Sequence, residues 1–336
     1  MLSYILRRLL MTIPVLLGIT LVSFMALSVT ADPTSAILGQ HATLERMADL
    51  RTQLGLDDPI PVQYYHYLVK LAHGDLGRSW MTRAPVITEI AQRFPHTVEL
   101  TVLAVILSVI LGVAVGVISA VKQYSWFDNV SMIGALVGVS MPIFWLGLVL
   151  IAIFPVKLGI LHVSGLIDPK LALTSFEPKT HFYLTESLVT ANWEVFRNVL
   201  GHLVLPSFAL AAASTALVAR MTRSSLLEVV NQDYIRTARA KGLSERLVVY
   251  KHALKNALIP VFTVVGLQFG ALLGGAVLTE TTFSLPGVGK LAVDAILNGD
   301  MPLVNGIVLL VALAFVLVNL LVDVLYGWLD PRIHYS

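Results

Sequence analysis

The sequence has no cysteine and very little charge. Of its 336 residues, 13% are charged and 56% are hydrophobic, whereas about 25% of the residues in soluble proteins are charged. The absence of cysteine excludes a disulfide framework, a thioether-linked haem and a thiolate metal site. The shortage of charge excludes an ordinary soluble domain, so we expect an integral membrane protein. The formal net charge of +2 is uninformative beside the uneven placement of the charges.

Charged residues are missing altogether from six long stretches of the chain. These stretches are residues 9–31, 100–121, 129–156, 198–219, 256–279 and 301–322. Each has at least 22 residues, and a helix needs about 20 to cross a bilayer. The sequence therefore predicts an all-α integral membrane protein with six transmembrane helices.

The first stretch has two interpretations. Arg7 and Arg8 precede it and residues 29–31 read Val-Thr-Ala, as in a signal peptide with its cleavage site. A signal peptide has an apolar core of only about 7–15 residues, so a membrane span is the better interpretation. Lys and Arg are denser in residues 1–8, 122–128, 220–255 and 323–336 than in the other connecting segments. This bias predicts that both termini are cytoplasmic.

Ionisable groups are almost absent from the span interiors, where His202 is the exception. Charges inside a membrane usually mark ion or proton pathways, so their absence argues against an ion-coupled carrier or a voltage sensor. A membrane enzyme would need clustered catalytic groups, and no span has metal-ligand spacing. We therefore predict neither an enzyme nor a metal site. Solvated side chains are expected for the external histidines His41, His66, His73, His96, His162 and His181.

One long basic segment, residues 220–256, connects the fourth and fifth spans. It holds eight Lys or Arg against three acids. Apolar residues at spacings of three and four predict an amphipathic helix over residues 224–240. Gly242 is expected to end this helix, and Ser244 to begin a second helix that leads into the fifth span. A basic amphipathic helix can lie on lipid headgroups or dock a soluble partner, and the pattern alone permits both.

Residues 233–256 resemble the cytoplasmic EAA loop of ABC-importer permeases, which seats in a groove of the ATPase subunit. The general pattern is Glu-Ala-Ala, three residues and Gly; Arg236, Thr237, Ala238 and Gly242 stand at these positions, so the Glu and the first Ala are replaced. The sequence DYIRTARAKGL, followed by HALKNA, is similar to the peptide and nickel branch, nearest the dipeptide permeases. Three other stretches resemble the same branch: residues 54–80, 279–300 and 325–334.

This resemblance implies a permease subunit of an ATP-driven importer in the bacterial cytoplasmic membrane. It implies a second permease that shares the substrate path, two ATPase subunits that bind ATP and magnesium, an external substrate-binding protein and surrounding lipid. It implies no cofactor in this chain and no nucleic-acid partner. Di- or oligopeptides are the implied substrates, with nickel, glutathione or a haem precursor as alternatives. The residues implied to contact the ATPase are Asp233, Arg236, Thr237, Ala238, Gly242, His252 and Asn256.

Finer expectations concern the external segments and the spans. The external insertion, residues 32–99, is predicted to contain helices over 43–54 and 61–72, and a further helix is predicted over 290–297. Pro142 should kink the third span. Glycines four residues apart should let helices pack closely. These glycines are Gly112 and Gly116; Gly134 and Gly138; and Gly266, Gly270 and Gly274.

Three polar residues of the last two spans, Gln268, Asn305 and Asn319, are candidates for lining the substrate path. Interhelical hydrogen bonding is the alternative role for each. Residues 287–290 read Gly-Val-Gly-Lys but lack the first Gly and the Ser or Thr of a phosphate loop, so no ATP site is expected there. Two other functional classes remain open: a secondary carrier or channel, and a membrane scaffold that transports nothing.

Overall fold

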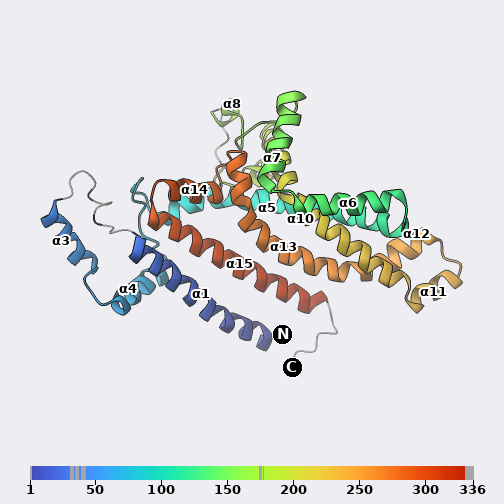
Figure 1. Cartoon of the computed structure of the whole chain (residues 1–336), viewed down its shortest axis with the longest axis horizontal. Coiled ribbons are helices and arrows are strands. Elements are labelled where there is room, and N and C mark those ends of the chain that lie inside the picture. The colour runs from blue at the N-terminus through green and yellow to red at the C-terminus, as the bar shows by residue number, and fades with distance from the viewer. Residues whose placement is uncertain are drawn as a thin grey trace.

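The computed structural model describes residues 2–30, 34, 38, 43–173, 176 and 178–329, and this part of the chain is almost wholly helical (Figure 1). The α-helices are α1 Leu2–Thr30, α3 Leu44–Leu54, α4 Ile60–Ala72, α5 Val86–Val121, α6 Trp126–Ser140, α7 Ile143–Ile151, α8 Pro169–Ala172, α9 Tyr183–Val189, α10 Trp193–Val230, α11 Asp233–Ala240, α12 Glu245–Leu247, α13 Leu254–Thr282, α14 Val288–Leu297 and α15 Met301–Leu329. Two π-helical turns, Ala152–Lys157 and Val248–Ala253, follow α7 and α12. The predicted all-α fold is confirmed for the described residues.

Several of these helices are long and apolar enough to cross a membrane. Four qualify singly: Val86–Val121, Trp193–Val230, Glu245–Thr282 and Met301–Val322. The bent pair Trp126–Ser140 and Ile143–Lys157 makes a fifth if it counts as one span. The apolar helix Leu10–Ala26, within α1, is shorter. The described residues therefore contain four or five helices that could span a membrane, and the sixth span stays a prediction.

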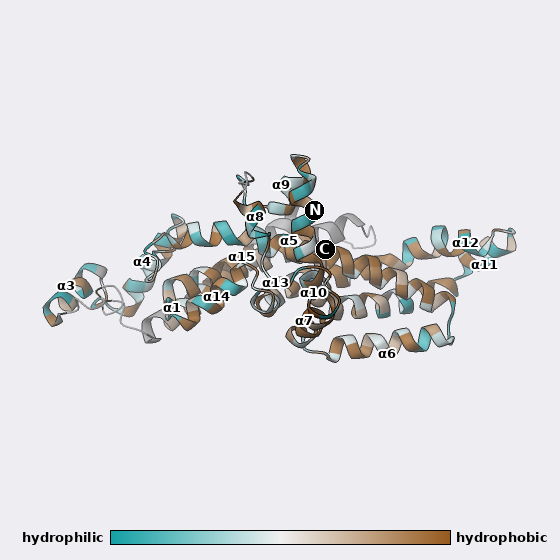
Figure 2. Ribbon diagram, turned by 90° about the horizontal axis from the view of Figure 1, so that it is seen from above, coloured by the Kyte–Doolittle hydropathy of each residue, from teal (hydrophilic) through white to brown (hydrophobic). Residues whose placement is uncertain are grey.

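Helix α10 lies at the centre of the bundle. It packs against α5, α6, α7, α9 and α13, while α15 packs against both α13 and α1 (Figure 1). Leu203, Ala209 and Leu210 of α10 are fully buried in the main apolar cluster. Figure 2 shows hydrophobic residues along the bundle, with hydrophilic residues gathered on α3, α4, α11 and α12. The long helices of the bundle are thus apolar, and these hydrophilic helices lie toward its two ends.

The third predicted span is broken at Pro142. The axes of its two halves are bent by 106° relative to each other. The bend arises because Met141 and Pro142 have extended backbone conformations with ψ of 127° and 132°. Proline disfavours the helical conformation at the preceding residue and cannot donate a backbone hydrogen bond. The predicted kink is confirmed, and it is sharp enough to divide the span into α6 and α7.

Helix α5 begins at Val86, well before the charge-free stretch that starts at residue 100. Pro85 precedes its first turn. The extra turns place His96 and Glu99 in the interior, with only 8% and 5% exposure. The backbone N–H of Thr185 donates to Glu99 Oε1 over 2.8 Å, and the rings of His96 and Tyr183 lie 5.5 Å apart. The prediction of a solvated His96 was therefore wrong, because α9 covers this part of α5.

Two helices follow α1, as the sequence predicts. Thr43 caps α3 by accepting a hydrogen bond from the Arg46 N–H, and Gly55 ends it with φ of 68°. The second helix, α4, lies against α1: the rings of Tyr64 and Tyr67 are 5.4 and 5.6 Å from the ring of Phe24. Burial raises the pKa of Tyr67 to about 12. These tyrosines therefore pack within the protein. His41 lies outside the described residues.

Helix α14 is held against the bundle by a buried carboxylate. Glu280, at the end of α13, is 1% exposed. Its oxygens accept hydrogen bonds from Thr97 Oγ1 over 2.6 Å and from the Lys290 N–H over 3.0 Å. A Cβ atom on Gly287 or Gly289 would lie within 3 Å of the Glu280 carboxylate. The glycines therefore let the backbone of the turn approach the carboxylate closely, and the helix predicted over 290–297 is confirmed with an earlier start.

Some of the predicted glycine pairs support close helix packing, and others do not. A Cβ atom on Gly112 would lie 2.7 Å from Val218 Cβ, and one on Gly116 would lie 2.6 Å from the Ala219 carbonyl. The first pair is therefore packed directly against α10. Gly266 and Gly270 are similarly close to side chains of α15, whereas Gly134 and Gly274 have open space and Gly138 makes only ordinary contacts.

We expect Gly116→Ala to destabilise the protein by about 1–3 kcal/mol, because α5 or α10 must shift to accommodate the new methyl group. Gly134→Ala is the matched control, since a methyl group there meets no atom within 4 Å. Its thermal midpoint in detergent should equal or exceed that of the parent, because alanine favours the helix over glycine. Equal midpoints for the two variants would contradict the close packing of α5 on α10.

Candidate coupling site

The basic segment, residues 220–256, projects from one end of the bundle, far from α3 and α4 (Figure 1). The prediction of a single helix over 224–240 was wrong, because α10 ends at Val230 and α11 begins at Asp233. The side-chain amide of Asn231 donates to the Leu227 carbonyl over 2.8 Å, and Gln232 is extended with ψ of 150°. An asparagine that bonds to a terminal carbonyl in this way favours the end of a helix.

Helix α11 has one face toward the bundle and one toward solvent. Ile235 and Ala238, three residues apart, are 0% and 8% exposed. Asp233, Arg236 and Thr237 are exposed, and Arg236 Nη1 lies 3.5 Å from Asp233 Oδ1. The period of the helix thus separates a small apolar anchor from a charged surface.

The turn after α11 is fixed at Gly242, as the sequence predicts. Its φ is +77°, a conformation that glycine adopts without the steric cost of a Cβ. Across this turn, Arg239 Nη2 donates to Glu245 Oε1 over 2.7 Å and Nε donates to Oε2 over 3.1 Å. The hydrogen bonds from Arg239 to the carboxylate raise the pKa of this guanidinium. The bidentate pair holds the two arms of the segment in one orientation.

The return arm starts at Ser244, which occupies the position before α12 but makes no side-chain capping bond. The predicted start of the helix is confirmed, and the chain continues without a break through the π-turn into α13. His252 is half-buried in the π-turn. Asn256 Nδ2 donates to Tyr234 Oη over 2.7 Å, which ties the start of α13 to α11.

A buried apolar cluster joins this segment to the membrane helices. Its residues come from α5, α10, α11, the π-turn and α13: Val117, Ala120, Leu226, Ile235, Ala238, Val248, Val249, Ala253 and Ala257. Close-packed protein interiors have low compressibility and transmit strain. A displacement of α11 would therefore be transmitted to α5, α10 and α13.

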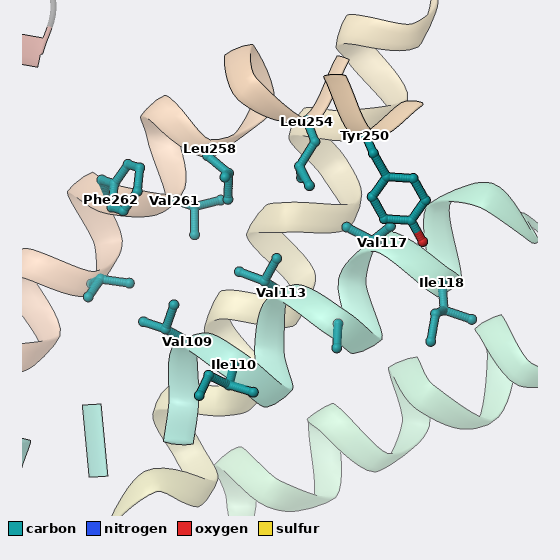
Figure 3. Close-up of a pocket in the computed structure, with 12 residues that line it drawn as sticks. Val109, Ile110, Val113, Val117, Ile118, Tyr250, Leu254, Leu258, Val261 and Phe262 are labelled. Atoms are coloured by element: carbon teal, nitrogen blue, oxygen red, sulfur yellow. The ribbon is translucent and has the colours of Figure 1, made fainter. Parts of the chain in front are cut away.

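An apolar groove of about 410 Å³ lies beside the cluster, between α5 and the beginning of α13 (Figure 3). Val109, Val113 and Val117 line one side, and Leu254 and Val261 line the other. The hydroxyl group of Tyr250 is the one polar side-chain group in its lining. None of Gln268, Asn305 and Asn319 is among the lining residues.

The three pathway candidates are not gathered at one place. Asn305 is buried, and its Nδ2 donates to the Ser23 carbonyl of α1 over 3.0 Å. Asn319 lies 14 residues further along α15, which is about 21 Å on a helix. Gln268 lies at the level of Asn319, since its neighbours Gly266 and Gly270 contact α15 near Val322 and Phe315. The contact of Asn305 supports the interhelical alternative for that residue.

Both parts of the chain are similar to known families of membrane proteins. Residues 112–335 match the family described as "Binding-protein-dependent transport system inner membrane component". Residues 1–101 match a second family, described as "Binding-prot-dependent transport system membrane comp, N-term". The chain belongs to the first of these families. It is therefore a permease subunit and a multi-pass protein of the bacterial cytoplasmic membrane.

Several relatives are similar over their whole length. The chain is 49% identical to the dipeptide transport system permease protein DppB of Alkalihalophilus pseudofirmus and 46% identical to that of Escherichia coli, in both cases over 100% of both chains. It is 42% identical to the glutathione transport system permease protein GsiC of Salmonella choleraesuis, again over 100% of both. A solved structure of the MetNI methionine ABC transporter matches 70% of this chain and 93% of its own, with a TM-score of 0.50 and 17% identity. That likeness concerns the fold.

One residue of the basic segment 220–256 forms an ion pair that the sequence did not indicate. Arg223 near the end of α10 donates two hydrogen bonds, of 2.6 and 2.8 Å, to the carboxylate of Asp128 at the start of α6. Asp128 is 2% exposed. The two residues lie 95 positions apart, so no spacing rule could pair them. No spacing rule could pair Asn256 with Tyr234 either. The pair of Arg239 and Glu245 could have been predicted, because the two residues flank the turn at Gly242.

Proposed function

We propose that this permease is a subunit of an ATP-driven importer of dipeptides and other short peptides. The similarity to dipeptide permeases over the whole chain supports this proposal. The relatives named above are permease proteins of dipeptide and glutathione transport systems, and these substrates are all short peptides. This favours a peptide over nickel or a haem precursor as the substrate.

The proposed complex contains a second permease, two ATPase subunits that bind ATP and magnesium, and an external substrate-binding protein. This chain supplies no cofactor and hydrolyses no ATP. It would cross the membrane six times with both termini in the cytoplasm, α1 providing the first span. The basic segment 220–256 is then cytoplasmic, as its excess of Lys and Arg favours.

The observation that carries the coupling role is the two-faced geometry of α11. Its exposed residues Asp233, Arg236 and Thr237 would contact an ATPase subunit, while Ile235 and Ala238 are buried against the spans. ATP-driven closure of the ATPase pair would displace α11 as a rigid body, and the buried cluster would pass that displacement to α5, α10 and α13. Gln268 and Asn319 remain candidates for contact with the substrate.

The test is a purification in mild detergent through an affinity tag, followed by reconstitution into liposomes. We expect two ATPase chains and a second permease to co-purify. Uptake of a labelled dipeptide should require ATP hydrolysis and should be reduced by unlabelled di- and tripeptides more strongly than by Ni²⁺. Recovery of the chain alone, or uptake that follows an ion gradient without ATP, would instead support a carrier or channel.

A further inference from the structure

Three potential metal ligands meet at the end of α10 that lies opposite α11. His162 and Asp168 belong to the segment between α7 and α8, and His202 belongs to α10. One ligand atom from each lies within 4.8 Å of the other two. The prediction of a solvated His162 was wrong, because its side chain is half-buried and its ring is stacked on that of His202 with centroids 3.7 Å apart. The fold thus assembles a group that no spacing rule could find.

The separations suit a shared metal ion better than direct hydrogen bonds. Nε2 of His162 lies 3.7 Å from Asp168 Oδ2, and Nε2 of His202 lies 3.7 Å from Asp168 Oδ1. Both distances are too long for a hydrogen bond. Ligands at about 2.0–2.1 Å from a tetrahedral zinc ion are about 3.3 Å apart. The rings of His162 and His202 are nearly parallel in the stack, so both cannot direct a lone pair at one ion there. Half-exposed His162 would turn out of the stack, and a small movement of half-exposed Asp168 would then bring the three ligands to that spacing.

Asn198 orients two of the three ligands. The backbone carbonyl of Asn198 lies 2.9 Å from Nδ1 of His202. A carbonyl can only accept, so Nδ1 carries the proton and Nε2 presents its lone pair toward Asp168. The Asn198 side chain also donates from Nδ2 to Asp168 Oδ2 over 2.5 Å and accepts from the Asp168 N–H over 3.0 Å. Outer partners that fix a histidine tautomer and a carboxylate in this way are typical of metal sites.

The burial of the three residues also suits a metal site. The side chain of His202 is 3% exposed, while those of His162 and Asp168 are 35% and 44% exposed. A cation could therefore enter from solvent. Within the described residues, Nδ1 of His162 is buried without a hydrogen-bond partner. No hydrogen bond at Nδ1 fixes the tautomer of this ring, so its Nε2 can also present a lone pair.

We propose that His162, Asp168 and His202 bind one divalent first-row transition metal ion, such as Zn²⁺ or Ni²⁺. Two imidazoles and one carboxylate are ligands that these ions accept, whereas Mg²⁺ and Ca²⁺ prefer oxygen ligands alone. Water from the exposed side would complete the coordination. The bound ion would tie the segment that precedes α8 to α10.

The test measures metal binding by the full-length chain, purified in detergent with a histidine-free tag and stripped with EDTA. Isothermal titration calorimetry with Zn²⁺ should show one ion bound per chain. Elemental analysis of the protein after gel filtration should give the same ratio. Zn²⁺ should also raise the thermal midpoint. His162→Gln should lose the bound ion and the midpoint shift. His66→Gln, which changes an exposed histidine of α4, should retain both.

Two further variants guard against a loss of binding through misfolding. Asp168→Asn has nearly the same shape and should lose the ion while it keeps the apo thermal midpoint. Asn198→Ala keeps all three ligands and should weaken Zn²⁺ binding by about 10–100-fold. Less than stoichiometric binding by the parent chain would overturn the proposal. So would equal binding by the parent and the folded His162→Gln and Asp168→Asn variants.

Discussion

ATP-dependent uptake should fall at least about tenfold, equal to about 1.4 kcal/mol, when Gly242 is replaced by aspartate, while the protein remains folded. A Cβ atom at Gly242 meets no atom within 4 Å, so no packing is lost. The backbone there has φ of +77°, and a new carboxylate would compete with Glu245 for Arg239. At a surface that docks a partner, an added unpaired charge is costly to desolvate. Uptake and substrate-stimulated ATP hydrolysis in the reconstituted complex measure the effect.

Gly299→Asp is the matched control for this experiment. Gly299 also follows a helix, has φ of +68° and has open space where a Cβ atom would lie. It lies after α14 and away from α11, so its substitution introduces the same charge and backbone strain outside the coupling segment. Its uptake should stay near that of the parent. Normal uptake and ATPase stimulation in Gly242→Asp would refute the coupling role of this turn.

The unfolding free energy should fall by about 3 kcal/mol when Arg223 is replaced by alanine. Removal of one partner from a buried ion pair typically costs about 3–5 kcal/mol, because the other charge is left unpaired. Asp128 is 2% exposed and would keep only its hydrogen bond from the Tyr124 N–H. We expect the lower end of that range because the Arg223 side chain is 23% exposed. Chemical denaturation in detergent micelles measures the change.

Arg220→Ala is the control, since Arg220 is exposed and lies one turn before Arg223 on the same helix. Its loss should change the unfolding free energy by less than about 0.5 kcal/mol. The double variant Asp128→Ala with Arg223→Ala should be less destabilised than the sum of the two single variants. Similar stabilities of Arg220→Ala and Arg223→Ala would mean that the pair does not hold α6 to α10.

Local signals made part of the coupling site predictable. Gly242 marks the end of α11 because glycine tolerates a positive φ, and Ser244 marks the start of the return arm. The prediction of a single helix over residues 224–240 was wrong for a local reason. The apolar period continues across residues 231 and 232, so it gave no sign of the break there. The amide of Asn231 satisfies the Leu227 carbonyl and so favours a helix end within an otherwise helical pattern.

The sequence by itself determined the class of this protein. Long charge-free stretches require helices in a bilayer, since unsatisfied backbone groups are too costly there, and the family motifs are local in sequence. Only the tertiary structure decided which glycines contact a neighbouring helix, that Asp128 pairs with Arg223, and that His162 meets His202. These pairings join residues far apart in the chain. They depend on how the helices pack, and neither periodicity nor spacing along the sequence encodes that packing.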